Sequence, residues 1–428
     1  MASSVITMPS ITVVNKSAAN GSKIPARLYW SKYIGRGIVP LFEKTGTYTE
    51  EQQASHLKFL SDVVAPDLGP LPTDPHPQYT MPYVGAPLEF SLNLSSTGKA
   101  KARMTFEVVG PADKTGPDPF GEDLSREILR RQARAVGANT QWLESVIDST
   151  FLTPEETQVV RAQGVPPFVP SSMWAYDFDG SKRSMKAYFA SFRKAMATGK
   201  SGTEVLLDAI RCLDDGLKPG LDLYTEYLNE RKGKMNVVLL GIDCIDPKDA
   251  RVKIYTNVKA NSWESVVDFW TLGGRLNDET TLKGLEIVRS IFPILMDEPD
   301  ILKDETWCKP ERIKGIPFNG LQFSVELAPG RALPEIKLYV PMCQYNRNTQ
   351  VLQKNVEAAL KKMNHEWGHN GKYMDAMKAV FPGEDDFRGI GFITFSYSKK
   401  KGAYTTSYLM LPTEHGEQEL SDSTFEYN

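Results

Sequence analysis

The hydrophobic pattern of the chain switches between a helical period and strict alternation. Apolar residues recur at helical spacing over residues 26–46 and 49–69, and the second stretch opens on Thr-Glu-Glu, which is typical of a helix N-terminus. Residues 87–96 and 101–110 then alternate apolar and polar side chains and are separated by Ser, Thr and Gly, so they predict a β-hairpin. Residues 123–149 return to the helical period.

This order of a strand pair followed by helices recurs along the chain. Further strand pairs are predicted around residues 182–191 and at residues 234–258, 320–343 and 388–411. Five antiparallel pairs divided by helices, with no linker between them, indicate one large sheet with helices outside it. Ten strands in one sheet tend to close into a barrel, because closure removes the exposed edges.

The pattern therefore predicts an α+β fold, a ten-stranded antiparallel barrel with helices outside and a lumen inside. We expect residues 24–428 to form this single domain and residues 1–23 to be a flexible tail. A helical-repeat binding protein is the non-catalytic alternative, and it predicts no lumen and little strand.

Three predicted strands carry a Lys-x-Tyr sequence on one face. The pairs are Lys186 and Tyr188, Lys253 and Tyr255, and Lys337 and Tyr339, with Arg251 on the same face as Lys253. In a barrel with helices outside, Val252 and Ile254 pack outward and the cations and phenols line the lumen. The same alternation is typical of strands that face solvent, but each triplet falls in a different strand pair, which favours the lumen.

Several cations in a lumen imply an anion. Buried like charges repel and are desolvated at a cost of several kcal/mol each unless an anion meets them. A diphosphate carries several negative charges and many acceptor oxygens, and a tyrosine face stabilises a cation by roughly 0.5–2 kcal/mol. Cations beside aromatic walls therefore point to ionisation of an allyl diphosphate.

Composition and net charge narrow the classes of molecule that this protein is expected to bind. The chain has 428 residues, 41% of them apolar, and a net charge of −3, so no global basic field favours nucleic acid or an anionic membrane. The mean hydropathy is −0.34, and no apolar stretch reaches the roughly 18 residues of a membrane helix. Four scattered cysteines and no signal peptide lead us to expect a cytoplasmic protein with reduced thiols.

The stretches GAPLEFSLN, MKAYF, ARVKIYTNV, DFWTLGG, IKLYVP and ITFSYSKKKGAYTTSYL occur together in this order. The chain thereby resembles the fungal aromatic prenyltransferases of the dimethylallyltryptophan synthase type over nearly its whole length. The resemblance implies an αββα barrel. It also implies transfer of a dimethylallyl group from dimethylallyl diphosphate to an aromatic carbon or nitrogen, usually of an indole, without a metal or another cofactor.

The resemblance also implies roles for individual residues. Glu89 matches the glutamate that accepts a hydrogen bond from the indole N–H, although a carboxylate on such a strand is also typical of a solvent-facing position. The implied diphosphate ligands are Arg103 (with Lys101 as its alternative), Lys186, Arg251, Lys253, Lys337 and Lys399. The implied cation-shielding residues are Tyr188, Tyr255, Tyr339, Tyr404 and Tyr408. Many relatives carry glutamine in place of Lys337 and tyrosine in place of Phe392, and the Lys-Lys-Lys run leaves the register at Lys399 open by one or two residues.

The absence of one arginine narrows the range of acceptors that we expect. Some tryptophan-using relatives have an arginine, upstream of the RVKIY strand, that anchors the amino-acid carboxylate, and residues 235–244 contain none. This favours a larger or less charged acceptor, such as a cyclic dipeptide, an indole terpenoid or a tryptophan derivative. The attacked position and the choice between a monomer and a homodimer stay open.

A zinc metallopeptidase is the competing enzyme class. His365, Glu366 and His369 form an H-E-x-x-H sequence, which on a helix places both histidines on one side. Asn370 and a glycine follow at once and predict the end of that helix, and Glu384 is the one candidate for a third ligand. Magnesium-dependent chemistry needs a D-D-x-x-D run, which the acidic stretches do not complete.

Overall fold

The computed structural model describes residues 25–72, 86–110, 115–164, 171–312, 319–382, 389–411 and 413. The predicted tail at residues 1–23 and the candidate ligand Glu384 lie outside these residues.

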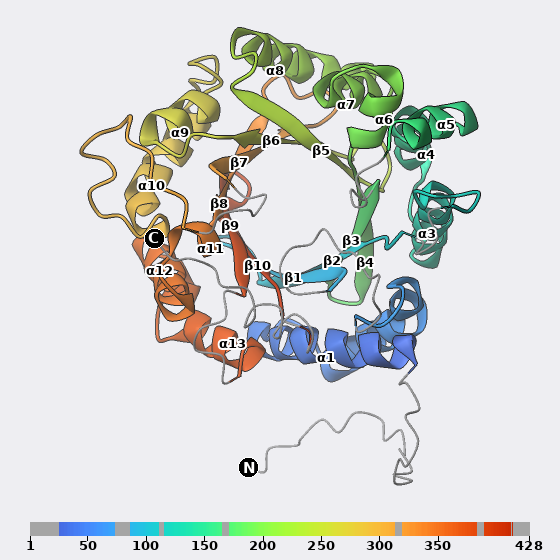
Figure 1. Ribbon diagram of the computed structural model, residues 1–428. Coiled ribbons are helices and arrows are strands. Elements are labelled where there is room, and N and C mark those ends of the chain that lie inside the picture. The colour runs from blue at the N-terminus through green and yellow to red at the C-terminus, as the bar shows by residue number, and fades with distance from the viewer. Residues whose placement is uncertain are drawn as a thin grey trace.

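Ten antiparallel strands form a closed barrel (Figure 1). Each strand pairs with its neighbours in the chain, and β1 closes the sheet by pairing with β10. The strands are β1 (Leu88–Ser95), β2 (Lys101–Glu107), β3 (Ser172–Asp179), β4 (Lys182–Phe189), β5 (Met235–Asp243), β6 (Val252–Val258), β7 (Leu321–Leu327), β8 (Glu335–Pro341), β9 (Ile390–Ser398) and β10 (Gly402–Leu409). The predicted barrel is confirmed, and the helical-repeat alternative is wrong.

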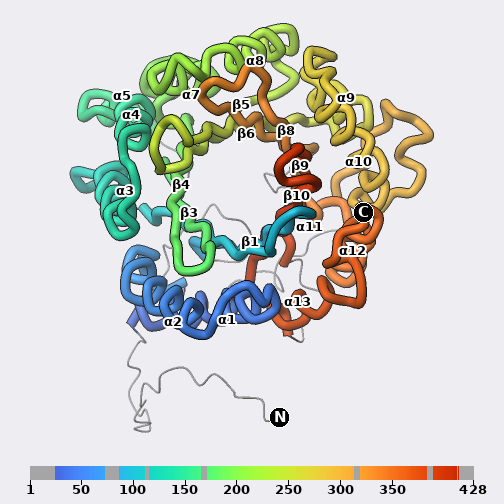
Figure 2. The backbone as a smooth tube through the Cα atoms, turned by 180° about the vertical axis from the view of Figure 1, so that it is seen from behind, coloured from blue at the N-terminus to red at the C-terminus, as the bar shows by residue number. Residues whose placement is uncertain are grey.

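Helices surround the barrel in chain order, as Figures 1 and 2 show from its two ends. They are α1 (Ala26–Thr45), α2 (Glu50–Phe59), α3 (Glu122–Ala135), α4 (Gln141–Thr150), α5 (Pro154–Ala162), α6 (Phe192–Thr198), α7 (Gly202–Arg211), α8 (Lys218–Glu230), α9 (Trp263–Trp270), α10 (Glu279–Leu295), α11 (Met342–Tyr345), α12 (Thr349–Lys362) and α13 (Lys372–Val380). Among the described helices, none combines the length and the apolar character needed to cross a bilayer.

The strands sort their side chains between two environments. In β7, Leu321, Phe323 and Val325 are fully or almost fully buried in the layer between sheet and helices, whereas Gln322 and Glu326 alternate with them on the opposite face. This period of two follows from the pleat of an extended chain. The main hydrophobic core is therefore a shell around the barrel, and the lumen is left for polar and aromatic residues.

Helix α1 packs closely on β1. Gly37 lies on its buried face, where a Cβ atom would be 2.4 Å from Cζ of Phe90 and 2.6 Å from Cδ1 of Leu411. The absence of a side chain at Gly37 thus determines how closely α1 approaches the sheet. Helix α1 in turn forms the outer layer behind β1, the strand that carries Glu89.

We expect the Gly37→Ala variant to be less stable than the wild type by about 1–3 kcal/mol, because the added methyl group overpacks the contact with Phe90. The gain in helix propensity, about 1 kcal/mol, opposes this loss only in part. The free energy of unfolding from denaturant titration measures the difference. Lys32→Ala on the exposed face of α1 is the matched control, and equal stability of Gly37→Ala and the wild type would contradict the packing argument.

Candidate active site

The Lys-x-Tyr sequences bring their two residue types into separate groups inside the barrel. Lys253 and Lys337 line one cavity, whereas Tyr188, Tyr255 and Tyr339 pack against one another in a separate lumen cluster. In each Lys-x-Tyr sequence the two side chains lie on the same strand face, two residues apart, so the tyrosine lies one step further along the barrel than its lysine. The Lys-x-Tyr spacing therefore gives the lumen a basic end and, next to it, an aromatic section.

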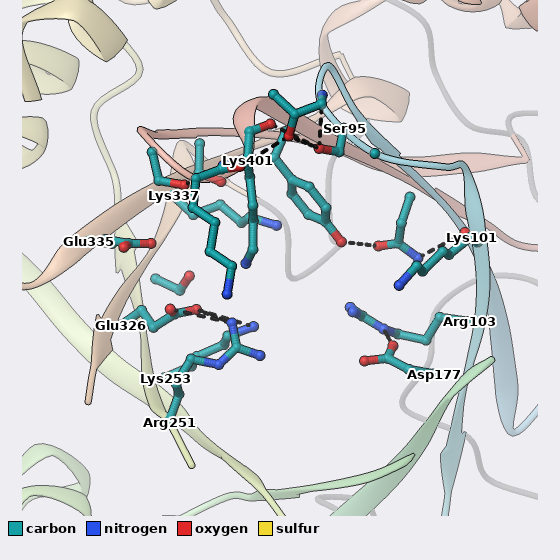
Figure 3. A pocket seen from close by; sticks show the side chains of 18 of the residues that line it. Ser95, Lys101, Arg103, Asp177, Arg251, Lys253, Glu326, Glu335, Lys337 and Lys401 are labelled. Atoms are coloured by element: carbon teal, nitrogen blue, oxygen red, sulfur yellow. Dashed lines mark hydrogen bonds and ion pairs between the residues drawn. The ribbon is translucent and has the colours of Figure 1, made fainter. Parts of the chain in front are cut away.

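The basic end is a cavity of about 490 Å³, next to the hairpin turns β1–β2 and β9–β10 (Figure 3). Arg103 and Asp177 lie across it from Arg251, Lys253 and Glu326. Eight lysine and arginine side chains line it, namely Lys99, Lys101, Arg103, Arg251, Lys253, Lys337, Lys400 and Lys401, against the four carboxylates Asp177, Asp179, Glu326 and Glu335. The cavity is thus locally basic in a chain with a net charge of −3.

Lumen carboxylates neutralise part of this charge. Asp243 of β5 pairs with Lys186 and, at 2.7 Å, with Nε of Arg251. Burial raises the pKa of Asp243, but the positive charges of Lys186 and Arg251 outweigh it and hold that pKa well below its ordinary value. The carboxylate is therefore ionised, and the two cations stay charged inside the protein.

Two lysines of the cavity are less well compensated. Burial and the positive charge of Arg251 lower the pKa of Lys253 to about 7, although Glu326 lies 3.6 Å from its Nζ. Burial and the charges of Lys253 and Arg103 lower the pKa of Lys337 well below its ordinary value. Nζ of Lys337 lies 4.5 Å from the centroid of the Tyr404 ring, and the described residues offer it no carboxylate within ion-pair distance. Both amines are suited to gain a proton when an anion arrives.

The aromatic section is a chain of ring contacts. The ring centroids of Tyr188 and Tyr255 are 6.1 Å apart, those of Tyr255 and Tyr339 are 5.7 Å apart, and those of Tyr339 and Tyr408 are 6.1 Å apart. Gly241 lies against the Tyr188 ring, since a Cβ atom added at Gly241 would be 3.0 Å from that ring. The four rings present a continuous electron-rich surface, as cation–π stabilisation requires.

Apolar side chains continue this section away from the cavity. Met173, Val238, Leu239 and Phe392 pack against the tyrosine cluster. A bulge in β5 between Val237 and Leu239 gives that strand two neighbouring apolar residues at the cluster. The section is thus apolar and aromatic in character, as sites for aromatic molecules generally are.

Glu89 lies on the lumen face of β1, opposite Thr105 of β2. Its neighbours Leu88 and Phe90 are fully buried in the outer core. Burial raises the pKa of Glu89 to about 7, against the lowering effects of a hydrogen bond from Thr105 and the charge of Arg103. Glu89 can therefore exist as a carboxylate or a carboxylic acid near neutral pH.

The turn between β9 and β10 decides which lysine faces the cavity. Lys399 points outward, where its Nζ lies 3.2 Å from Glu279 and its side chain is 74% exposed. Lys400 and Lys401 line the cavity, and Nζ of Lys401 lies 5.3 Å from the centroid of the Tyr404 ring. The position predicted for the C-terminal cation is therefore one or two residues out, because turn geometry, and not strand alternation, directs these side chains.

Tyr404 also differs from its predicted surroundings. Its hydroxyl donates a hydrogen bond to Asn93 at 3.0 Å, and its ring lies beside Lys337 and Lys401 in the basic cavity. It is not a member of the cluster that contains the other four predicted tyrosines. Lys101, the alternative to Arg103, pairs with Asp179 at 2.6 Å at the edge of the cavity, whereas Arg103 is buried beside Asp177.

Three lumen carboxylates, Asp177, Asp243 and Glu326, are not among the site residues predicted from the sequence. A signal was present, because each one alternates with outward apolar residues such as Tyr176 and Phe178 on the two sides of Asp177. The period of two that places the Lys-x-Tyr residues in the lumen also places these three carboxylates there, in β3, β5 and β7.

The H-E-x-x-H sequence does not form a zinc site in the described structure. Glu366–Gly368 form a short 3-10 helix between α12 and α13 rather than a turn of α-helix. His365 is buried and its Nδ1 accepts a hydrogen bond from the backbone N–H of Trp367, while Glu366 pairs with Lys372 at 2.8 Å. Within the described ranges, no three His, Cys, Asp or Glu side chains are arranged to hold a metal.

Comparison with known sequences identifies relatives over nearly the whole chain. Residues 26–376 match the family described as tryptophan dimethylallyltransferase. The indole prenyltransferase tdiB of Emericella nidulans is 44% identical over 400 residues, which cover 90% of this chain and 95% of the relative. The indole diterpene prenyltransferase terF of Tolypocladium album is 34% identical, over 94% of this chain and 96% of the relative.

Solved structures share the fold. The crystal structure of AnaPT from Neosartorya fischeri superposes with a TM-score of 0.77 at 24% sequence identity, covering 91% of this chain and 95% of that one. At this identity the likeness concerns the architecture of barrel and helices.

We expect the binding of inorganic diphosphate at about pH 8 to take up protons, because Lys253, with a pKa of about 7, is largely neutral there until the anion binds. Affinity should accordingly fall as the pH rises above 7. Calorimetry in buffers of different ionisation enthalpy counts the protons. Lys253→Arg keeps the charge without a titration in this range, so it should reduce the uptake. Unchanged proton uptake in this variant would contradict the assignment.

Proposed function

This chain belongs to the tryptophan dimethylallyltransferase family and is a prenyltransferase of indole compounds, and from this premise we propose its reaction in detail. The enzyme transfers a dimethylallyl group from dimethylallyl diphosphate to an aromatic carbon or nitrogen of an indole-containing secondary metabolite, without a metal ion. The observation that carries this proposal is the placement of a basic cavity directly beside a tyrosine wall in one closed lumen.

The basic cavity binds the diphosphate of the donor. Its ligands are Arg103, Arg251, Lys253 and Lys337, with Lys186 next to them through its ion pair with the lining residue Asp177, and with Lys401 in the position that the resemblance gave to Lys399. These cations stabilise the charge that develops on the diphosphate oxygen as the C–O bond of the donor breaks. Lys337 and Lys401 also contact the Tyr404 ring, which supports Tyr404 as a residue that orders these two amines.

The tyrosine wall stabilises the allyl group that is left. The cation is electron-poor, and the rings of Tyr188, Tyr255, Tyr339 and Tyr408 offer it π-faces in place of water. Exclusion of water also protects the cation from hydrolysis. The Lys-x-Tyr spacing supports a tyrosine wall that lies deeper in the lumen than the basic cavity, because each lysine precedes its tyrosine by two residues on one strand face.

Glu89 holds the acceptor. As a carboxylate it accepts a hydrogen bond from the indole N–H, which makes the ring more nucleophilic and orients it towards the allyl cation. The ring carbon or nitrogen then forms the new bond to the allyl carbon. Loss of one proton from the attacked atom restores aromaticity, and the raised pKa of Glu89 suits it to take up that proton.

The acceptor is a molecule larger or less charged than free tryptophan. The lumen residues of β5 at the tyrosine cluster are Val238 and Leu239, which offer no cation to an amino-acid carboxylate. A cyclic dipeptide, an indole terpenoid or a tryptophan derivative fits such walls. The name of terF as an indole diterpene prenyltransferase supports this class of acceptor.

The carboxylates of the lumen support a metal-independent reaction. Asp177, Asp243 and Glu326 each form ion pairs with lysine or arginine side chains. A magnesium ion would have to displace those cations to reach its oxygen ligands. The cations themselves supply the neutralisation that a metal gives to diphosphate in other enzymes.

We expect the purified protein to prenylate an indole acceptor from dimethylallyl diphosphate in the presence of EDTA. Mass spectrometry of a panel of indole compounds detects the product, and free tryptophan should react more slowly than an uncharged indole derivative. A parallel reaction with added magnesium is the control. Complete loss of activity in EDTA that magnesium restores would contradict the metal-independent mechanism.

For Glu89→Gln we expect kcat/KM for the acceptor to fall by about a hundredfold or more, because an amide is a weaker acceptor and no base. Since the carboxylate is the active form, kcat/KM of the wild type for the acceptor, measured at saturating donor, should rise with pH through about 7, the pKa of Glu89, and then level off. The variant should lack this rise. Near-normal activity of a folded Glu89→Gln protein would remove Glu89 from the mechanism.

A further inference from the structure

The cations of the lumen are linked by carboxylates into one chain across six neighbouring strands. Beginning at β2, positive and negative side chains alternate in the order Arg103, Asp177, Lys186, Asp243, Arg251, Glu326 and Lys253. Asp177 pairs with Arg103 and, at 3.3 Å, with Lys186. Glu326 lies 3.2 Å from Arg251 and 3.6 Å from Lys253.

Asp243 is the centre of this chain. It contacts Lys186 with one carboxylate oxygen and Arg251 with the other, and its side chain is only 6% exposed. Lys186, at 7% exposed, has few other means to keep its charge in the protein interior. A buried carboxylate between two cations fixes the distance between them as well as their charge.

These pairs leave part of each cation available to a ligand. Arg251 donates from Nε to Asp243 and from Nη1 to Glu326, and Nη2 meets no hydrogen-bond partner among the described residues. An ammonium group has three N–H donors, and Lys186 directs its contacts to Asp177 and Asp243. The carboxylates thus hold the cations from the wall side, while the remaining donors can serve a diphosphate.

We propose that Asp243 is a positioning residue that holds Lys186 and Arg251 in the geometry required to stabilise the departing diphosphate, with Asp177 and Glu326 extending the same support to Arg103 and Lys253. The inference rests on the proposed function of the basic cavity. It adds that the catalytic power of the cations depends on the protein's own carboxylates, which hold those cations in place.

Simple charge counting and positioning predict different outcomes for Asp243→Asn. Asp243→Asn removes one negative charge, and loss of a proton from Lys186 would at most cancel this gain, so the site becomes no less basic and its affinity for inorganic diphosphate should be unchanged or higher. If Asp243 positions the cations, kcat at saturating donor should nevertheless fall by about tenfold or more, because misplaced charges stabilise the transition state poorly. If Asp243 merely offsets charge, kcat stays within about threefold of the wild type, and that result overturns the proposal.

The experiment compares kcat with the dissociation constant of inorganic diphosphate in three full-length variants. Asp208→Asn is the matched control, because Asp208 also bridges two cations, Lys200 at 2.8 Å and Arg211 at 2.6 Å, but on the outer surface. It should retain wild-type kcat. Circular dichroism verifies the folding of each variant.

Glu326→Gln decides the question if Asp243→Asn does not fold. It removes one link further along the chain, at a side chain that is 13% exposed, and leaves the pair of Asp243 with Lys186 in place. A kcat reduced by about tenfold with undiminished diphosphate affinity supports positioning, and a kcat within about threefold of the wild type overturns it. A wild-type protein without prenyl transfer would instead contradict the proposed function, so the two failures are distinguishable.

Discussion

The backbone of an antiparallel strand sends neighbouring side chains to opposite sides, and in a closed sheet the inner side meets water only at the ends of the barrel. Charges on that side must therefore be neutralised by one another or by a ligand. Here seven charged side chains from six strands satisfy this requirement as an alternating chain. The position of the basic cavity, the protonation of its lysines and the room left for an anion all follow from how that chain is built.

The lumen separates two kinds of chemistry along its length. Ion pairs and ammonium groups occupy the end near the β1–β2 and β9–β10 turns, and tyrosine rings with apolar side chains occupy the next section. Glu89 belongs to the second section, yet it feels the charge of Arg103. In the proposed reaction, this polarity admits a donor with an anionic head and an apolar tail in one orientation, with its reactive carbon at the boundary between the two sections.

Periodicity predicted most of the fold, because ten strands and their helices follow rules that act within a few residues. The Lys-x-Tyr strands were predicted for the same reason, and their residues do gather in one lumen. The rule fails where direction depends on a turn, as at Lys399 and Lys401. At His365, by contrast, the Asn370-Gly371 pair already indicated that the H-E-x-x-H sequence lacks the helix that a zinc site needs. The pairing of Asp243 with Lys186 depends on contacts between strands 57 residues apart, for which a single sequence carries no local signal.

The bulge in β5 has a consequence for how this enzyme could diversify. It adds one residue to a single strand, so Val238 and Leu239 both reach the tyrosine cluster while Gly241 and Asp243 keep their register with β4. Replacement of those two residues would reshape the chamber for the aromatic partner without moving any member of the ionic chain. New product ranges could thus arise in evolution by exchange of two neighbouring codons, while the ionic chain that we propose to stabilise the diphosphate is inherited intact.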